Sequence, residues 1–162
     1  MCHYLCGCLK GEMDIAMAEL RKMNKTAVKK CAEIYINAYG EAPWNEKYRP
    51  EDVEKYITDF MDSDTKCAYV LAAGEEIIGV AVGLVIPCVG SRYFRLEDIC
   101  IDPEYQRMGY GRDFIELMAD SLGGKDCDSI LLGTQREYPS HKFYLKNGFR
   151  EIDSVLLYRE IE

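Results

Sequence analysis

The fold is decided by the stretch Asp102-Pro103-Glu104-Tyr105-Gln106-Arg107-Met108-Gly109-Tyr110-Gly111-Arg112. It joins an apolar run that predicts a strand to an amphipathic run that predicts a helix. Two glycines separated by one residue allow a tight turn, because glycine adopts positive φ without steric cost. The first amides of the following helix lack intrahelical partners, and the helix dipole adds partial positive charge there. We predict that this turn binds an anion such as a pyrophosphate group.

Two common phosphate-binding motifs do not match this stretch. A P-loop requires Lys-Ser/Thr directly after its last glycine, whereas Arg-Asp follows here. A dinucleotide-binding fingerprint requires a third glycine, and Phe114 occupies its place. The motif that does match is Gln/Arg-x-x-Gly-x-Gly, which begins at Gln106 and ends at Gly111.

A second motif lies downstream, at Phe143-Tyr144-Leu145-Lys146-Asn147-Gly148-Phe149. Together with Ile101-Asp102-Pro103 and the glycine motif, it resembles the GNAT superfamily of acetyl-CoA-dependent N-acyltransferases. The resemblance extends from roughly Ile15 to the C-terminus and is sharpest from Leu96 to Phe149. It implies acetyl-CoA as acyl-donor cosubstrate, and a mixed β-sheet that splays after the strand preceding the glycine motif.

Composition sets the broad class. The chain has 162 residues, of which 48% are apolar, and this suits one domain with one core. A net charge of −8 disfavours nucleic acid as a partner and mildly favours cationic small substrates. No apolar run approaches the ~18 residues of a membrane span, and no secretory signal pattern is visible. We therefore expect a cytoplasmic protein with no membrane partner.

The chain contains eight cysteines. Those scattered singly along the predicted elements are expected to be reduced thiols, which often act as small buried hydrophobic residues: Cys31, Cys67, Cys88, Cys100 and Cys127. Cys2, Cys6 and Cys8 cluster with His3, but this spacing lacks a Cys-x-x-Cys pair and a second ligand pair. We predict no metal site. Residues 1–12 are expected to be a poorly ordered N-terminal segment, and residues 13–162 a GNAT-like acetyltransferase domain.

Hydrophobic periodicity predicts a single α/β domain with the order β-α-α-β-β-β-α-β-α-β. The predicted strands cover residues 14–20, 67–73, 76–86, 93–101, 129–134 and 149–158, and the predicted helices cover residues 24–39, 50–61, 111–122 and 140–147. The strand at 129–134 is nearly all apolar, as expected of a buried parallel neighbour. The resemblance implies that helices flank a mixed, splayed sheet.

Acetyl transfer to an amine requires a base, a group that polarises the thioester carbonyl, and an acid near the sulfur. Glu97 and Asp98 are the candidate bases, with Glu97 ranked slightly first. Successive strand residues face opposite sides, so only one can enter a cleft unless a bulge intervenes. Alternatively, either is a solvated edge charge or pairs with Arg95. The resemblance implies that Tyr144 is the acid, with packing of its short helix as the alternative.

The resemblance also implies a set of coenzyme-binding residues. They are the backbone amides of Ile99, Cys100 and Ile101, the motif residues Gln106, Arg107, Met108, Gly109, Tyr110, Gly111 and Arg112, and the pocket residues Thr134 and Ser140. Glu137 departs from the family pattern, which often has Asn there. Trp44, Glu46 and Tyr48 lie in the expected acceptor region, where aromatic and acidic groups suit a cationic amine. Trp44 could equally be a core residue between the first two helices.

These observations predict an acetyl-CoA-dependent N-acetyltransferase that acts on a primary amine, of a small cationic metabolite or amino sugar, by direct ternary-complex transfer. A covalent route through Cys100 is less favoured, because nothing nearby marks it as an activated thiol. Two alternatives stay open, namely a non-catalytic acyl-CoA-binding or sensing module and a protein N-acetyltransferase. The resemblance also allows a homodimer.

Overall fold

In the computed structural model, which describes residues 17–61, 63 and 65–161, five strands form one sheet in chain order. They are β1 (Ala18–Lys22), β2 (Lys66–Ala73), β3 (Glu76–Cys88), β4 (Ser91–Ile101) and β5 (Ser129–Leu131). The first four pair antiparallel, and β4 pairs parallel with β5. The result is the expected α/β domain with a mixed, open sheet.

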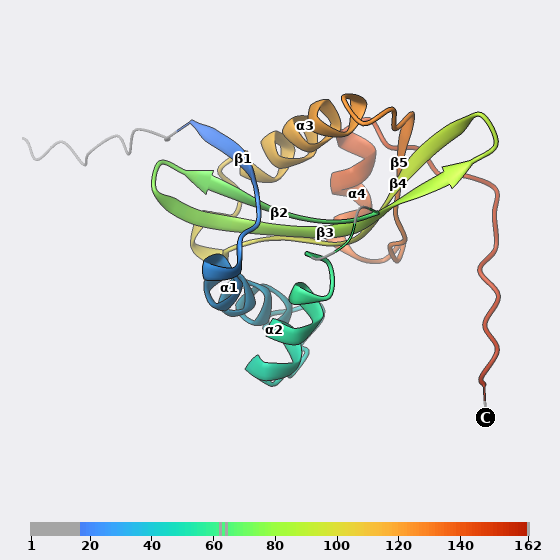
Figure 1. The fold of residues 1–162 in the computed structure, drawn as a ribbon. Coiled ribbons are helices and arrows are strands. Elements are labelled where there is room, and N and C mark those ends of the chain that lie inside the picture. Colours follow the sequence, from blue (N-terminus) through green and yellow to red (C-terminus); the bar gives the residue numbers. More distant parts are fainter. Residues whose placement is uncertain (1–16, 62, 64, 162) are drawn as a thin grey trace, which may run out of the picture.

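Helices cover both faces of this sheet (Figure 1). The elements α1 (Val28–Gly40) and α2 (Pro50–Thr58) lie on one face, and α3 (Tyr110–Gly123) and α4 (Pro139–Lys146) lie on the other. Short 3₁₀ turns, η1 (Lys25–Ala27) and η2 (Pro103–Tyr105), precede α1 and α3. Pro50 stands in the first turn of α2, where its missing N–H costs nothing.

Each face of the sheet has its own apolar core. Ile34, Ile57 and Val82 are buried on the side of α1 and α2. Phe94 and Phe114 are buried on the side of α3. Because β2 and β3 are covered on both faces, they consist of nearly continuous apolar runs. The two helical layers therefore hold the middle of the sheet rigidly.

A β-bulge interrupts the pairing of β3 with β4. Val82 lies opposite Asp98, but Gly83 lies opposite Leu96, so Glu97 is the extra residue. Before the bulge, Phe94 and Leu96 point into the core under α3. After it, Cys100 points into the core under α1 and α2. Even-numbered residues of β4 therefore face the core under α3 before the bulge and the core under α1 and α2 after it.

The predicted helices and the antiparallel hairpin of β2 with β3 are confirmed, with boundaries shifted by a few residues. The first strand begins later than predicted, at Ala18, and residues 14–16 lie outside the described part. The fifth strand is parallel to β4 as predicted, but it is shorter and not buried. Ser129 and Leu131 are exposed, because β5 is the edge strand of the sheet.

The predicted final strand at 149–158 is wrong. Residues 150–161 pair with no described strand and run away from the body of the molecule (Figure 1). The apolar residues there, Ile152 and Val155 to Tyr158, suit a strand by composition, but a strand also needs a neighbouring strand to pair with. In this arrangement the segment contacts none, so its side chains are exposed.

The sheet opens between β4 and β5. Their pairing covers only Tyr93 to Arg95 on β4, so the rest of β4, up to Ile101, has no hydrogen-bonded neighbour in β5. This agrees with the expected splay beside the glycine motif. None of the described helices is long and apolar enough to cross a membrane. The predicted N-terminal segment 1–12, with its cysteine cluster, lies outside the described residues.

Candidate functional site

The glycine turn (residues 106–112) follows the free end of β4. Asp102 begins η2 by accepting a hydrogen bond from the amide of Glu104 at 3.2 Å, and Pro103 provides the first position of that turn. Arg107 and Gly109 then adopt left-handed conformations, with φ of 63° and 95°. A Cβ at Gly109 would meet no atom within 4 Å, so φ rather than space explains glycine there.

The amides of this turn are available to a ligand. Those of Arg107, Met108 and Gly109 donate to no group in the described chain. They lie immediately before the N-terminus of α3, which begins at Tyr110. Successive amides around left-handed residues form a concave anion site, and the helix dipole reinforces it. The turn therefore has the geometry that a pyrophosphate group requires, and its binding of such a group stays a prediction.

The charged side chains of the turn are not equivalent. Arg107 forms no ion pair with a described residue. Arg112 contacts Asp113 at 3.0 Å and Glu116 at 3.9 Å on its own helix. The side chain of Gln106 donates to the carbonyl of Ile101 at 3.0 Å and so ties the turn to the end of β4.

Tyr144 lies close to this turn because α4 packs on the start of α3. A Cβ at Gly111 would lie 3.2 Å from the Phe143 ring, so glycine permits this close contact. The Tyr144 ring packs edge-on against Phe143 and Phe149, each with ring centroids 5.3 Å apart. Its hydroxyl has no hydrogen-bond partner among the described residues. Burial, followed by the charges of Asp98 and Cys100, raises the pKa of Tyr144 to about 12.

On the opposite side of β4, Asp98 is held by two phenols. Tyr39 donates to one carboxylate oxygen at 3.0 Å, and Tyr56 donates to the other at 2.5 Å. Burial and the neighbouring Asp98 raise the pKa of both phenols, so both remain donors. In the part of the chain that the structure describes, no cationic side chain pairs with Asp98.

Glu97 is bound differently. The Arg95 guanidinium donates to its carboxylate on the outer part of β4. The negative charge of Glu97 still contributes to the raised pKa of Tyr56, behind burial and Asp98. The bulge therefore brings both carboxylates to the side of α1 and α2. The sequence did not decide which of the two carboxylates faces the cleft. The ion pair with Arg95, one of the alternatives that the sequence left open, is present at Glu97.

Aromatic rings extend from Asp98 toward the loop between α1 and α2. The Trp44 ring lies edge-on to Tyr39 at 5.5 Å and to Tyr138 at 6.1 Å. Tyr48 is partly exposed and lies edge-on to Tyr35 at 5.7 Å. The Glu46 side chain is exposed. Trp44 and Tyr48 thus belong to the group of aromatic rings that extends from Asp98. Burial, followed by the charge of Glu46, raises the pKa of Tyr48, so Glu46 lies near the outer end of this group.

The remaining predicted residues fall into two groups. Ile99 and Ile101 face the core under α3, and the carbonyl of Ile99 accepts a weak bond from Tyr39 at 3.5 Å. Thr134 and Ser140 share a hydroxyl–hydroxyl hydrogen bond of 2.9 Å between β5 and α4. This bond joins the segment after β5 to the first turn of α4.

Cys100 is not an activated thiol. It is buried in the core under α1 and α2, and burial followed by the charge of Asp98 raises its pKa. Because the thiolate is the nucleophile, a raised pKa lowers reactivity. The structure gives no support for a covalent route through this residue.

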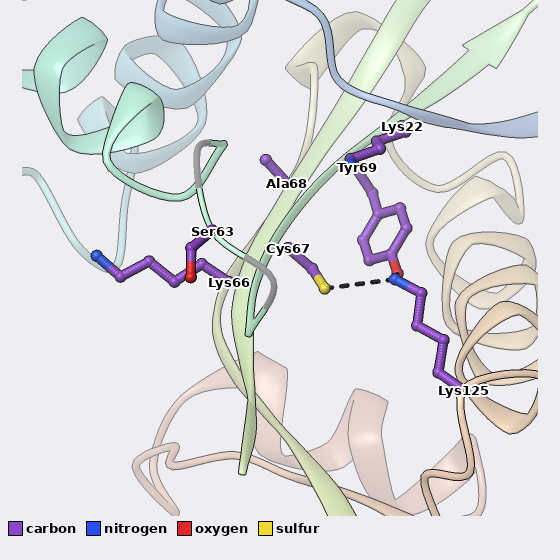
Figure 2. Close-up of a pocket in the computed structure, with 7 residues that line it drawn as sticks. All are labelled: Lys22, Ser63, Lys66, Cys67, Ala68, Tyr69 and Lys125. Carbon is purple, nitrogen blue, oxygen red and sulfur yellow. Dashed lines mark hydrogen bonds between the residues drawn. The ribbon is translucent and has the colours of Figure 1, made fainter.

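A separate hollow of about 140 Å³ lies at the start of β2 (Figure 2). Lys22, Lys66 and Lys125 line it, and Lys125 donates to the Tyr69 hydroxyl at 3.0 Å and contacts the Cys67 sulfur at 3.5 Å. In Figure 2 the Lys66 and Lys125 side chains point in different directions. The hollow contains none of the residues predicted for the site, and its lysines do not converge.

The sequence missed the tyrosines around Asp98. Tyr35, Tyr39 and Tyr56 lie at helical spacing on the inner faces of α1 and α2, where they pack in or against the core. The available signal was chemical, because three phenols on inner helix faces require polar partners. Asp98 was the nearest acidic candidate on the sheet.

Comparisons with known proteins agree with this geometry. Residues 15–149 match the model of the acetyltransferase (GNAT) family. A "possible acetyltransferase" from Clostridium difficile 630 has a similar structure, with a TM-score of 0.79 and 11% identity, covering 90% of this chain and 98% of its own. The aminoglycoside N-acetyltransferase AAC(6')-Iy in complex with CoA is also similar, with a TM-score of 0.72 and 20% identity, over 90% and 95% of the two chains.

A third similar structure is an aminoglycoside acetyltransferase from an uncultured soil metagenomic sample, in complex with sisomicin. Its TM-score is 0.69 and its identity 12%, over 90% of this chain and 97% of its own. At sequence identities of 11%, 12% and 20%, these three structural similarities show that the fold is shared. A comparison with curated proteins found no match.

The environment of the cysteines predicts their reactivity. Cys88 is exposed, whereas burial raises the pKa of Cys31 to about 12 and also raises that of Cys100. With iodoacetamide at pH 8, peptide mass spectrometry should show that Cys88 is alkylated at least tenfold faster than either buried thiol. A pKa difference on the order of one unit already changes the thiolate fraction by that factor. Equal rates for Cys100 and Cys88 in the folded protein would contradict this assignment. Unfolding in denaturant should abolish the difference.

Proposed function

Since the chain belongs to the acetyltransferase (GNAT) family, we propose that it acetylates a primary amine of a small cationic metabolite or amino sugar. It is an acyltransferase, and acetyl-CoA is its acyl donor. A cytoplasmic location is part of the proposal and is supported by the free, largely buried cysteines. The boundary of the domain at residue 13 is likewise proposed, and the family match begins at residue 15.

The environment of Asp98 is the observation that supports a cationic acceptor. Asp98 is a half-buried carboxylate that receives two phenol hydrogen bonds but no cation from the described chain. Aromatic rings of Trp44, Tyr39 and Tyr48 line the approach to it. An ammonium ion satisfies both features, by charge attraction to the carboxylate and by cation–π contact with the rings. Two similar structures are aminoglycoside acetyltransferases, which supports an amino-sugar acceptor.

The coenzyme is proposed to lie along the free edge of β4. The free amides of the glycine turn and Arg107 would hold the pyrophosphate, and Tyr110 to Arg112 would contribute the start of α3. The backbone of Ile99 to Ile101 would face the pantetheine arm, with Thr134 and Ser140 on the other side of the opening. The turn has the geometry that such a group requires.

In the proposed reaction, the amine nitrogen attacks the thioester carbonyl, the C–N bond forms and the C–S bond breaks. An acceptor that binds as an ammonium ion must first lose one proton to solvent, because a nitrogen without a lone pair cannot attack. The neutral nitrogen loses one further proton as the C–N bond forms, and the departing thiolate gains one. We assign the proton lost during attack to Asp98, with Glu97 as a nearby second carboxylate held by Arg95. We assign the proton gained by the thiolate to Tyr144, whose hydroxyl has no partner in the described chain and whose raised pKa keeps it protonated.

The direct test is a panel of amines with detection of free CoA thiol. Amino sugars and diamines should release thiol faster than neutral amines of similar size. A matched control is Gly109→Val, which should lose acetyl-CoA binding in calorimetry because a β-branched residue strains a φ of 95°. Coenzyme binding without turnover of any amine would favour a sensing module, and turnover of peptides alone would favour a protein acetyltransferase.

Replacement of the two carboxylates should separate their roles. Asp98→Asn should lower kcat by about 10²–10⁴-fold, which is typical of a lost general base, and should raise KM for cationic amines. Glu97→Gln, the matched control on the same bulge, should cost less than about tenfold, because Glu97 is already paired with Arg95. Steady-state kinetics between pH 6 and pH 9 would measure both. Equal losses, or full activity of Asp98→Asn, would refute this assignment.

Tyr144→Phe should remove one hydroxyl while leaving the ring contacts intact. Because that hydroxyl has no partner in the described part, melting temperature and coenzyme affinity should hardly change, whereas kcat and kcat/KM should fall together. The pKa of Tyr144, raised to about 12, predicts no loss of this acid below about pH 11. The defect should shrink above about pH 8.5, where a thiolate leaves with less help. A defect in KM alone would make Tyr144 a binding residue instead.

A further inference from the structure

Trp44 and Tyr138 bring the two helical layers into contact. Trp44 lies in the loop between α1 and α2, and Tyr138 immediately precedes α4. These helices cover opposite faces of the sheet (Figure 1), yet the two rings lie edge-on with their centroids 6.1 Å apart. The pairing of β4 with β5 ends at Arg95 and Leu131, and Tyr138 follows that end in the chain. The contact therefore forms beyond the paired part of β5.

The loop between α1 and α2 holds Trp44 in a defined place. The amide of Asn45 donates to the carbonyl of Glu41 at 3.0 Å. The amide of Glu46 donates to the carbonyl of Tyr39, near the end of α1, at 2.9 Å. These two bonds close the loop around Trp44, whose ring lies against that of Tyr39 with centroids 5.5 Å apart.

The start of α4 holds Tyr138 in a similar way. Its amide donates to the carbonyl of Gln135, and its carbonyl accepts from the amide of His141, both at 3.1 Å. Pro139 follows directly and restricts the preceding residue to extended backbone, which Tyr138 adopts with φ of −82° and ψ of 147°. The ring contact is therefore made by two anchored segments.

These contacts form a closed circuit around the space between the proposed base and the proposed acid. Tyr39 donates to Asp98 at 3.0 Å and also contacts Trp44. Trp44 contacts Tyr138, and α4 then leads to Tyr144. The circuit closes because Tyr144 lies near enough to Asp98 for that charge, after burial, to raise its pKa. An acceptor amine held between Asp98 and Tyr144 is thus bounded on the side of Trp44 and Tyr138.

Both rings are available to a bound molecule. Trp44 and Tyr138 are half-buried. The indole N–H of Trp44 and the hydroxyl of Tyr138 bond to no described residue, and neither atom is buried. An edge-on ring pair is favourable without any hydrogen bond. These polar atoms can therefore contact a molecule that is held beside Asp98.

We propose that Trp44 and Tyr138 form an aromatic bridge that sets the size of the acceptor. The aromatic bridge admits a primary amine on a small, narrow molecule and excludes a lysine within a polypeptide. A bound polypeptide continues on both sides of its lysine and needs an open groove or edge, which the circuit of contacts interrupts. The inference rests on the proposed function, since it concerns the acceptor of that same reaction, and it makes Tyr138 a specificity-determining residue.

Acetylation of an alkyl amine on carriers of increasing size tests the aromatic bridge. The acceptors are cadaverine, Nα-acetyl-lysine amide and a capped peptide with a central lysine, and the readout is free CoA thiol. For the wild type, kcat/KM for the peptide should be at least about 100-fold below that for cadaverine, the scale on which a shaped pocket discriminates. Tyr138→Ala should narrow this difference at least about tenfold, because it removes one side of the aromatic bridge.

Tyr138→Phe is the matched control. It keeps the ring and removes only the hydroxyl, so the difference between cadaverine and the peptide should stay as in the wild type. Circular dichroism should show an unchanged fold for both variants, since Trp44 is the only described ring that Tyr138 contacts. An unchanged difference in Tyr138→Ala would overturn the proposal. So would a wild type that acetylates the peptide as fast as cadaverine.

The fluorescence of Trp44 tests the aromatic bridge without turnover. Trp44 is the only tryptophan in the chain, so the signal reports on this ring alone. Cadaverine should change the wild-type signal in a saturable way, whereas the peptide should do so only in Tyr138→Ala. If cadaverine changes the signal but no amine releases thiol, the proposed function fails and the aromatic bridge stands. If amines release thiol but none changes the signal, the aromatic bridge is overturned and the proposed function stands.

Discussion

The β-bulge at Glu97 is the constraint on which the rest of the site depends. Regular alternation along β4 would place Asp98 on the same face as Phe94 and Leu96, inside the apolar core under α3. A carboxylate buried there without partners would cost several kcal/mol. The extra residue turns Asp98 to the other face, where two phenols satisfy it. Gly83 makes this possible, because a Cβ there would lie 2.4 Å from the Arg95 carbonyl oxygen.

The same strand also organises the opposite side of the site. It separates from β5 after Arg95 and continues to Ile101 paired only with β3, and η2 then links it to the glycine turn. α4 reaches this turn because glycine at 111 lets Phe143 approach α3 closely. Tyr144 then lies near enough to Asp98 for that charge to raise its pKa, although the two residues stand on different layers. One strand and one turn therefore organise Asp98, Tyr144 and the amides of the glycine turn, which are the groups that we propose as base, acid and anion site.

What the sequence could predict was local. Helical spacing, glycine positions and strand composition depend on near neighbours, so the four helices, the first five strands and the glycine turn were predicted correctly, whereas the last strand was not. The position of the bulge could not be predicted, because it depends on how β4 pairs with Gly83 of β3. Helical periodicity is consistent with Tyr39 and Tyr56 on inner faces, but periodicity does not identify the hydrogen-bond partner of a hydroxyl. The apolar residues at the C-terminus indicated a strand, but composition alone does not provide a neighbouring strand, and the described segment pairs with none.

Two opposing effects act on an ammonium ion beside Asp98, and their balance orders the proposed proton transfers. A neighbouring carboxylate raises the ammonium pKa by about 1–3 units, whereas desolvation by aromatic rings lowers it. Because Asp98 is only half-buried and Tyr48 is partly exposed, desolvation is incomplete and the charge effect prevails. In the proposed reaction Asp98 therefore favours binding of the cation. The nitrogen must still lose one proton to solvent before it attacks, because an ammonium ion has no lone pair. As the C–N bond forms, the nitrogen gains positive charge and becomes far more acidic, and the carboxylate that bound the cation is then in place to accept the second proton.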